Sequence, residues 1–176
     1  MRIALSTATV FALVLSLCGG PAFAQSVPTG CRLEAVAGNA RHILHCPNGL
    51  TVTAEAGARY SLIDSNADSR PDAVSLRDKA VLVDDVDAKL IKNGFRVITP
   101  QAIAAVRGTQ WAVDVKDGVT SVFVLRGRVA VRRPQAAGDV FLDPGEGVDV
   151  SVGRTPLTVK RWPPARAAAL LARLGQ

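Results

Sequence analysis

Apolar side chains alternate with polar ones along nearly the whole chain beyond residue 24. A period of two is typical of strands that bury one face. Turn sequences rich in Gly, Pro, Asn and Asp separate the alternating runs at intervals of about ten residues. The pattern therefore predicts an all-β fold of stacked, twisted antiparallel strands, arranged as a β-solenoid or a sandwich. The alternating apolar positions are Leu50, Val52, Ala54; Tyr60, Leu62; Val74, Leu76; Val81, Val83; Phe95, Val97; Trp111, Val113, Val115; Phe123, Leu125; Val129, Val131; and Val148, Val150, Val152.

Two of the turn sequences, Asn93-Gly94 and Asp117-Gly118, are typical of tight hairpins, because these residue types tolerate a positive φ. The C-terminal end carries a different signal. Pro163 and Pro164 precede a run of Ala, Leu and Arg that ends in Leu174, which favours a short helix. We expect a short terminal helix that packs on the β body or frays from it, with Leu170, Leu171 and Leu174 on one face. A helix that docks on a partner is the alternative.

The first 24 residues have the order of a secretory signal peptide. Arg2 supplies the positive charge, the run from Val10 to Cys18 is almost wholly apolar, and Ala22-Phe23-Ala24 forms a cleavage site. We therefore expect an exported protein that starts at Gln25. A membrane anchor is disfavoured because the apolar run is too short to span a bilayer. A lipoprotein anchored at Cys18 is disfavoured because Leu17 is large. No later stretch predicts a transmembrane segment.

Cleavage leaves two cysteines, Cys31 and Cys46, which we expect to form a disulfide in an oxidising compartment. The segment between them predicts a hairpin that turns at Gly38-Asn39 and places the two cysteines opposite each other. The closed loop of roughly 16 residues predicts a stabilisation of roughly 3 kcal/mol in the chain-entropy model. We expect a structural role, because neither cysteine lies in a Cys-x-x-Cys pair.

Charge and export together indicate the class of partner. Without Arg2 the chain has 20 basic side chains against 15 acidic ones, a net charge of +5. Nucleic acid is not the natural partner of an exported basic protein, whereas anionic lipid, polysaccharide or an acidic protein surface is. Four arginines around one predicted strand form a basic edge that could bind anions or could simply be solvated: Arg126, Arg128, Arg132 and Arg133.

Catalytic signatures are absent from the sequence, which contains no Gly-x-Ser-x-Gly, phosphate loop or His-Glu-x-x-His. His42 and His45 lie in a predicted strand and would point to opposite faces, which disfavours a joint metal site. A cluster of Asp84, Asp85 and Asp87 could supply paired carboxylates for hydrolysis. A charged turn is the favoured interpretation, because nothing nearby resembles a sugar-binding aromatic platform.

The acidic loop after Ile63 partly matches a calcium loop, because oxygen side chains alternate along it. The candidate ligands are Asp64, Asn66, Asp68 and Asp72. The turn-forming Gly of an EF-hand is replaced by Ser69, and Ser75 stands where a bidentate Glu belongs. The alternative is a polar Asx-type turn between two strands.

The segment TPQAIAAVRGTQWAV resembles the core motif of the FecR domain family. The matching residues are Thr99, Pro100, Ala102, Val106, Arg107, Gly108, Thr109, Trp111 and Val113. The sequence that follows, to about residue 152, also resembles the family. Its last part, from Val140 to Val150, resembles the closing hairpin of the family. From the residues alone we expect Pro100 at a strand start, a bend at Gly108, and Arg107 donating to carbonyls freed there.

The resemblance implies a periplasmic β domain of the kind that relays signals to a sigma-factor system. The sequence has no internal membrane span, so we expect an exported, non-enzymatic binding or signalling module rather than a complete relay. A structural protein that binds the cell envelope, through peptidoglycan or an anionic glycan, is the alternative, and an envelope hydrolase is a third. We divide the chain into a signal peptide (1–24), N-terminal hairpins with the disulfide (25–94), the FecR-like domain (95–152), and a C-terminal strand and helix (153–176).

Overall fold

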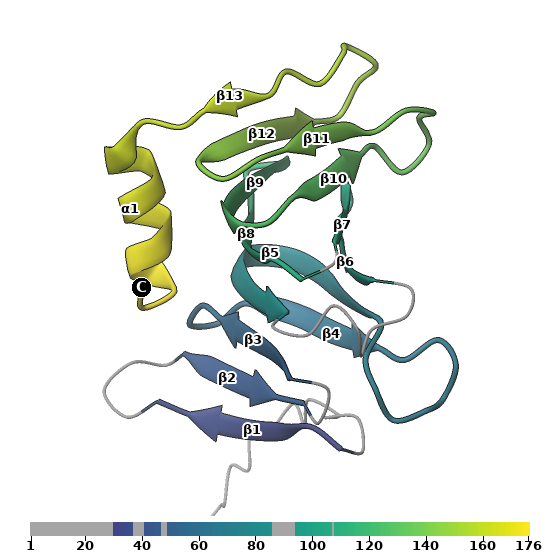
Figure 1. Ribbon diagram of the computed structural model, residues 1–176, viewed down its shortest axis with the longest axis vertical. Coiled ribbons are helices and arrows are strands. Elements are labelled where there is room, and N and C mark those ends of the chain that lie inside the picture. Colours follow the sequence, from purple (N-terminus) through teal and green to yellow (C-terminus); the bar gives the residue numbers. More distant parts are fainter. Residues whose placement is uncertain (1–29, 37–40, 47–48, 86–93, 107) are drawn as a thin grey trace, which may run out of the picture.

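The computed structural model describes residues 30–36, 41–46, 49–85, 94–106 and 108–176. The predicted signal peptide, the predicted turn at Gly38-Asn39, and the residues Asp87, Asn93 and Arg107 lie outside the described residues. The described elements are β1 (Arg32–Ala35), β2 (His42–His45), β3 (Leu50–Ala54), β4 (Arg59–Ile63), β5 (Ala73–Asp85), β6 (Phe95–Ile98), β7 (Ile103–Val106), β8 (Gln110–Lys116), β9 (Val119–Arg126), β10 (Val129–Arg132), β11 (Val140–Leu142), β12 (Glu146–Ser151), β13 (Lys160–Arg161) and α1 (Pro164–Arg173) (Figure 1). The prediction of an all-β fold with a short C-terminal helix is confirmed.

Strand β5 organises the molecule because two sheets share it. Its first part, up to Asp78, pairs with β4 and β6, whereas its second part pairs with β3 and β8. Between the parts, Lys79 has a positive φ of 64° that bends the strand. Sheet A runs in the order β1-β2-β3-β5-β8-β9-β12-β13, and sheet B in the order β4-β5-β6-β7-β10-β11. The described strand pairs are antiparallel except β5–β6, which is parallel and departs from the prediction.

The main core lies where the inner faces of the two sheets meet. Trp111 of sheet A and Phe95 of sheet B are fully buried, and their rings meet edge to face with centroids 6.3 Å apart. Around them pack the alternating apolar residues that the sequence singled out, including Val52, Val83 and Val97. Because each strand contributes every second side chain, the period of two is sufficient to build this core.

A second, smaller cluster lies on the outer face of sheet A, under α1. It consists of Ala80, Leu82, Ala112, Phe123, Trp162, Leu170 and Leu174. Strand β9 is therefore buried on both faces. The alternating pair Phe123 and Leu125 packs in this outer cluster, whereas Val122 and Val124 belong to the main core. Phe123 stacks on Trp162 with ring centroids 5.0 Å apart. The leucines of α1 pack on the β body, as expected.

The connections between strands confirm one turn and correct another. Asp117 and Gly118 join β8 to β9 with φ values of 49° and 74°, as expected for a tight hairpin. The expected closing hairpin is not formed, because β11 pairs with β10 in sheet B and β12 pairs with β9 in sheet A. Val152, expected in that last strand, follows its end and is 86% exposed.

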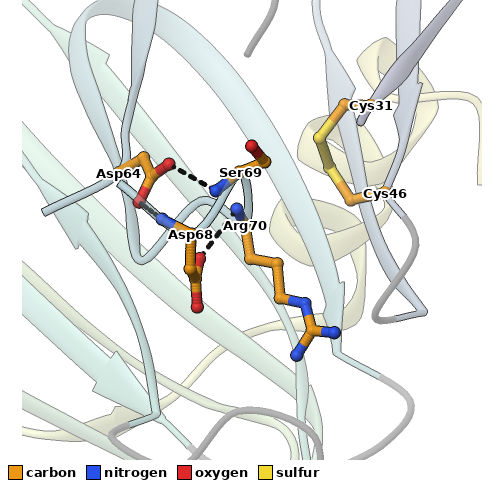
Figure 2. The surroundings of a disulfide bond; sticks show 6 residues. All are labelled: Cys31, Cys46, Asp64, Asp68, Ser69 and Arg70. Atoms are coloured by element: carbon orange, nitrogen blue, oxygen red, sulfur yellow. Dashed lines mark hydrogen bonds between the residues drawn. A yellow bond between two sulfur atoms is a disulfide. The ribbon is translucent and has the colours of Figure 1, made fainter. Parts of the chain in front are cut away.

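Cys31 and Cys46 form a disulfide with an S–S distance of 2.09 Å (Figure 2). The β1–β2 register pairs Arg32 with His45, so the two cysteines stand just beyond the paired ends of the hairpin, as predicted. The bond closes the open end of this hairpin.

Within the described residues, the single helix is too short to cross a bilayer.

Candidate interaction site

Thr99, the first residue of the family-like motif, holds a turn of sheet B against sheet A. Its hydroxyl accepts the Ala102 N–H at 2.8 Å and lies 2.8 Å from the hydroxyl of Thr120 in β9. The Thr120 hydroxyl in turn donates to Gln101 at 2.9 Å. Pro100 lies inside this turn and not at a strand start as expected, since β7 begins at Ile103. A fixed φ suits the second position of a turn.

Gly108 and Thr109 begin the approach to β8. Gly108 has a φ of 62°, which agrees with the expected bend. Thr109 is fully buried, and its hydroxyl has no hydrogen-bond partner within the described part of the chain. A Cβ on Gly127 would come within 2.3 Å of the Thr109 methyl, so the two segments pack in direct contact. The expected role of Arg107 as a donor stays a prediction, because that residue is outside the described ranges. Thr99, Gly108 and Thr109 thus lie in hydrogen-bond, turn and packing contacts.

The four arginines of the predicted basic edge have different surroundings. Arg126 pairs with Asp84 at 3.0 Å, and Arg128 pairs with Asp143 at 2.8 Å. Arg133 donates to the carbonyls of Ser151 and Thr155 at 2.9 Å each. Arg132 is exposed and has no ion pair in the described ranges. Anion binding by this edge stays a prediction, and Arg132 is its best remaining candidate.

Asp84, the described member of the hydrolase candidate, is held in structural contacts. Its carboxylate accepts hydrogen bonds from Arg126 and from the Gln110 side chain, both at 3.0 Å. Asp87 and the side chain of Asp85 are outside what the structure describes.

In the candidate calcium loop, side-chain carboxylates accept hydrogen bonds from backbone N–H groups of the loop (Figure 2). Asp64 accepts the N–H groups of Asp68 and Ser69 at 3.3 and 2.9 Å, and Asp68 accepts that of Arg70 at 2.9 Å. Asp72 accepts the Ser65 N–H at 2.7 Å. These contacts are typical of Asx turns. No three His, Cys, Asp or Glu residues of the described ranges are grouped to hold a metal ion. Calcium binding stays a prediction.

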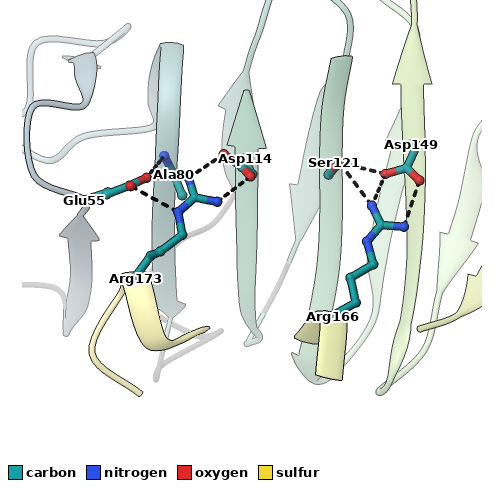
Figure 3. A network of polar contacts seen from close by, with 7 residues as sticks. All are labelled: Glu55, Ala80, Asp114, Ser121, Asp149, Arg166 and Arg173. Carbon is teal, nitrogen blue, oxygen red and sulfur yellow. Dashed lines mark hydrogen bonds and ion pairs between the residues drawn. The ribbon is translucent and has the colours of Figure 1, made fainter. Parts of the chain in front are cut away.

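Sequence reasoning missed the polar contacts that fix α1 to sheet A (Figure 3). Arg173 bridges Glu55 at 2.6 Å and Asp114 at 2.8 Å. The hydrogen bonds to Asp114 and Glu55 raise the pKa of Arg173 above its ordinary value. A guanidinium of the helix is thus held by two carboxylates, one in the loop after β3 and one in β8 of sheet A.

Arg166 fixes the other end of α1 to the same sheet. It contacts the Asp149 carboxylate at 2.5 Å and lies over the Trp162 ring at 3.6 Å. Burial raises the pKa of Asp149, but hydrogen bonds from Arg166 and Ser121 outweigh burial and lower the pKa below its ordinary value. The spacing of Arg166, Leu170 and Arg173 on one helix face was the only sequence signal for this attachment.

Comparisons with known proteins agree with this architecture. The family described as FecR protein matches residues 33–130, more than half of the chain. The match begins well before Thr99 and ends before β11, so it includes the N-terminal hairpins. Comparison with curated protein sequences gives no significant match.

Two crystal structures of a candidate anti-sigma factor from Parabacteroides distasonis share the fold. One has a TM-score of 0.58 at 21% identity and the other 0.60 at 20%. The alignments cover 74% and 80% of this chain, and 60% and 64% of the solved chains. The chain therefore spans less than two thirds of the length of these neighbours.

Proposed function

Because the chain belongs to the FecR family, we propose that this protein is an exported, non-enzymatic binding module that takes part in periplasmic signalling. The observation that carries the proposal is the family match over residues 33–130 on a two-sheet fold shared with a candidate anti-sigma factor. The proposal is supported by the predicted signal peptide and by a sequence without a recognisable catalytic motif. The partner is a protein of the cell envelope.

The described side chains that could act in catalysis are engaged with one another or with other residues, which supports binding over catalysis. Asp84 is ion-paired, and Cys31 and Cys46 are joined to each other. His45 contacts Glu34 at 3.3 Å on the exposed face of the first hairpin. A structural protein that binds an anionic envelope polymer remains the alternative, and it is favoured by the basic net charge and by the exposed Arg132.

Export is tested by fractionating cells that express the full chain. We expect the protein in the periplasmic fraction, with an N-terminus at Gln25 in mass spectrometry. A protein that stays in the cytoplasm with Arg2 still attached would contradict the proposal.

The signalling role is tested by deleting the gene and comparing transcripts with those of the parent strain. We expect a small, coherent set of promoters to change, and expression of the full chain in trans to restore them. Unchanged transcripts together with salt-sensitive sedimentation of the pure protein on peptidoglycan would favour the polymer-binding alternative. Turnover of an envelope glycan, lost in Asp85→Asn, would favour the hydrolase.

A further inference from the structure

The strands of sheet B pair with one another in sequence from β4 to β11. The inner positions of its strands belong to the main core, so the alternate positions point outward. The ladder registers align the outward positions in two rows across the sheet. The first row is Ile63, Ala73, Arg96, Ala105, Ala130 and Phe141, and the second is Ser61, Ser75, Ile98, Ile103 and Arg132. Ala73 is fully buried, whereas the other residues of the two rows are at least partly exposed.

Small and apolar side chains form the centre of this face. Ala105, Ala130, Ile98 and Ile103 are partly exposed, and Phe141 is 60% exposed. The outer face of sheet A, in contrast, is covered by α1 (Figure 1). Exposed apolar side chains that adjoin across neighbouring strands are typical of a surface that contacts a partner.

The charges in these two rows have one sign, and the neighbouring Asp143 is paired with Arg128. Arg96 lies within the first row and Arg132 at the end of the second, and Arg77 follows Ser75 on the same side of β5. All three are exposed, and none has an ion-pair partner in the part of the chain that the structure describes. Neither row contains an Asp or Glu. Two copies of this face would repel each other, whereas carboxylates on another protein would pair with its arginines.

The attachment of α1 shows how this molecule covers a sheet face. Leu170 and Leu174 pack on sheet A, and guanidinium–carboxylate pairs at Asp114 and Asp149 fix the two ends of the helix. On sheet B the arginines belong to the sheet. A matching partner must therefore present carboxylates around an apolar centre. An anionic glycan has the charge but lacks the apolar surface that Phe141 and the isoleucines would contact.

We propose that the outer face of sheet B, the surface formed by these two rows, is the docking site for an acidic protein partner. This inference rests on the proposed function, since it names the surface that the binding module uses. The partner covers Ala105 and Ala130, contacts Phe141, and pairs its carboxylates with Arg96 and Arg132.

The test uses a photo-crosslinking amino acid in the full chain, expressed in its native cells. Phe141→p-benzoylphenylalanine places the probe on the proposed face and conserves an exposed aromatic ring. Ala168→p-benzoylphenylalanine places it on the exposed side of α1 as the matched control. We expect a protein adduct from position 141 and none from position 168.

The adduct alone does not establish the chemistry, so the crosslinked protein is purified and its affinity measured. We expect Arg96→Glu/Arg132→Glu to weaken binding at least tenfold, and the wild-type affinity to fall as salt rises. The control Lys116→Glu/Arg154→Glu changes as many exposed charges outside the two rows and should leave the affinity within about twofold. Circular dichroism verifies that each variant is folded.

Several outcomes overturn the inference. These are an adduct from position 168 alone, a crosslinked homodimer, a glycan adduct, no adduct at position 141, or equal weakening by both charge-reversal pairs. If transcripts still respond to deletion of the gene in those cases, the signalling function stands and only the docking surface is wrong. If transcripts do not respond and neither position yields a protein adduct, both proposals fail.

Discussion

Arg173 and Glu55, 118 residues apart in the sequence, form a two-point ion pair with hydrogen bonds of 3.0 and 2.6 Å. The same guanidinium donates to both oxygens of Asp114 at 2.8 and 3.0 Å. One side chain of the last helical turn thus joins the loop after β3 to the centre of sheet A. The C-terminal helix is a fixed layer of the molecule, and its attachment can be tested directly.

Arg173→Met should reduce the free energy of unfolding by about 1–2 kcal/mol, because it leaves two mostly buried carboxylates unpaired while water screens part of the effect. Urea denaturation followed by circular dichroism measures the change. Arg154→Met, at an exposed position without an ion pair in the described residues, is the control and should be neutral. Equal midpoints for both variants would show that the bridge contributes nothing.

Stability should fall in acid partly through Asp149. A carboxyl whose pKa is lower in the folded state stabilises the fold at neutral pH, and this contribution is lost as pH falls from about 4 through the folded-state pKa. Asp149→Asn should therefore be less stable than the wild type at pH 7, and the difference should shrink by pH 2–3. A stability difference that is constant from pH 7 to pH 2 would contradict this assignment.

Thr99 and Thr109 form a matched pair of buried threonines with opposite expectations. Thr99→Val removes a hydroxyl that hydrogen-bonds to Ala102 and Thr120, and should cost about 1–3 kcal/mol. Thr109→Val replaces a buried hydroxyl without a partner in the described ranges, so it should be neutral or stabilising. Chemical denaturation of both variants decides the matter, and an equal loss in both would refute the hydrogen-bond argument.

Gly127→Ala should be far more damaging than Gly118→Ala, although both glycines have a positive φ, +83° and +74°. Each alanine incurs roughly 1–2 kcal/mol of left-handed strain. Only at Gly127 does the new Cβ collide, 2.3 Å from the Thr109 methyl, whereas nothing lies within 4 Å of it at Gly118. The thermal midpoints of the two variants should differ clearly, and similar midpoints would mean that Thr109 can move aside.

Thiol labelling of the native exported protein should detect no free cysteine, because Cys31 and Cys46 are bonded. Cys31→Ser/Cys46→Ser should lose about 3 kcal/mol by the chain-entropy argument, and the strands outside the first hairpin should keep their far-ultraviolet signal. Ready labelling of both cysteines without denaturant would show that the hairpin does not pair in this register.

Strand β5 shows what alternation along the sequence predicts and what it does not. Val74 and Leu76 have even numbers and Val81 and Val83 odd ones, so the alternation changes phase between these two runs. The structure has a single strand of 13 residues, in which the positive φ of Lys79 moves the chain from one sheet to the other. The side that each residue buries was predictable, but the sharing of one strand by two sheets was not.

The sequence by itself determined the strand content, the buried alternation at Val52, Val97 and Val113, the Asp117-Gly118 hairpin and the Cys31–Cys46 pairing. All of these depend on backbone geometry within one strand or one hairpin. Only the tertiary structure decided which face of β9 takes Phe123, that β11 and β12 join different sheets, and that Arg173 meets Glu55. Those outcomes depend on the order of strands within the sheets, and strand order arises from contacts between segments distant in sequence, which no periodicity records.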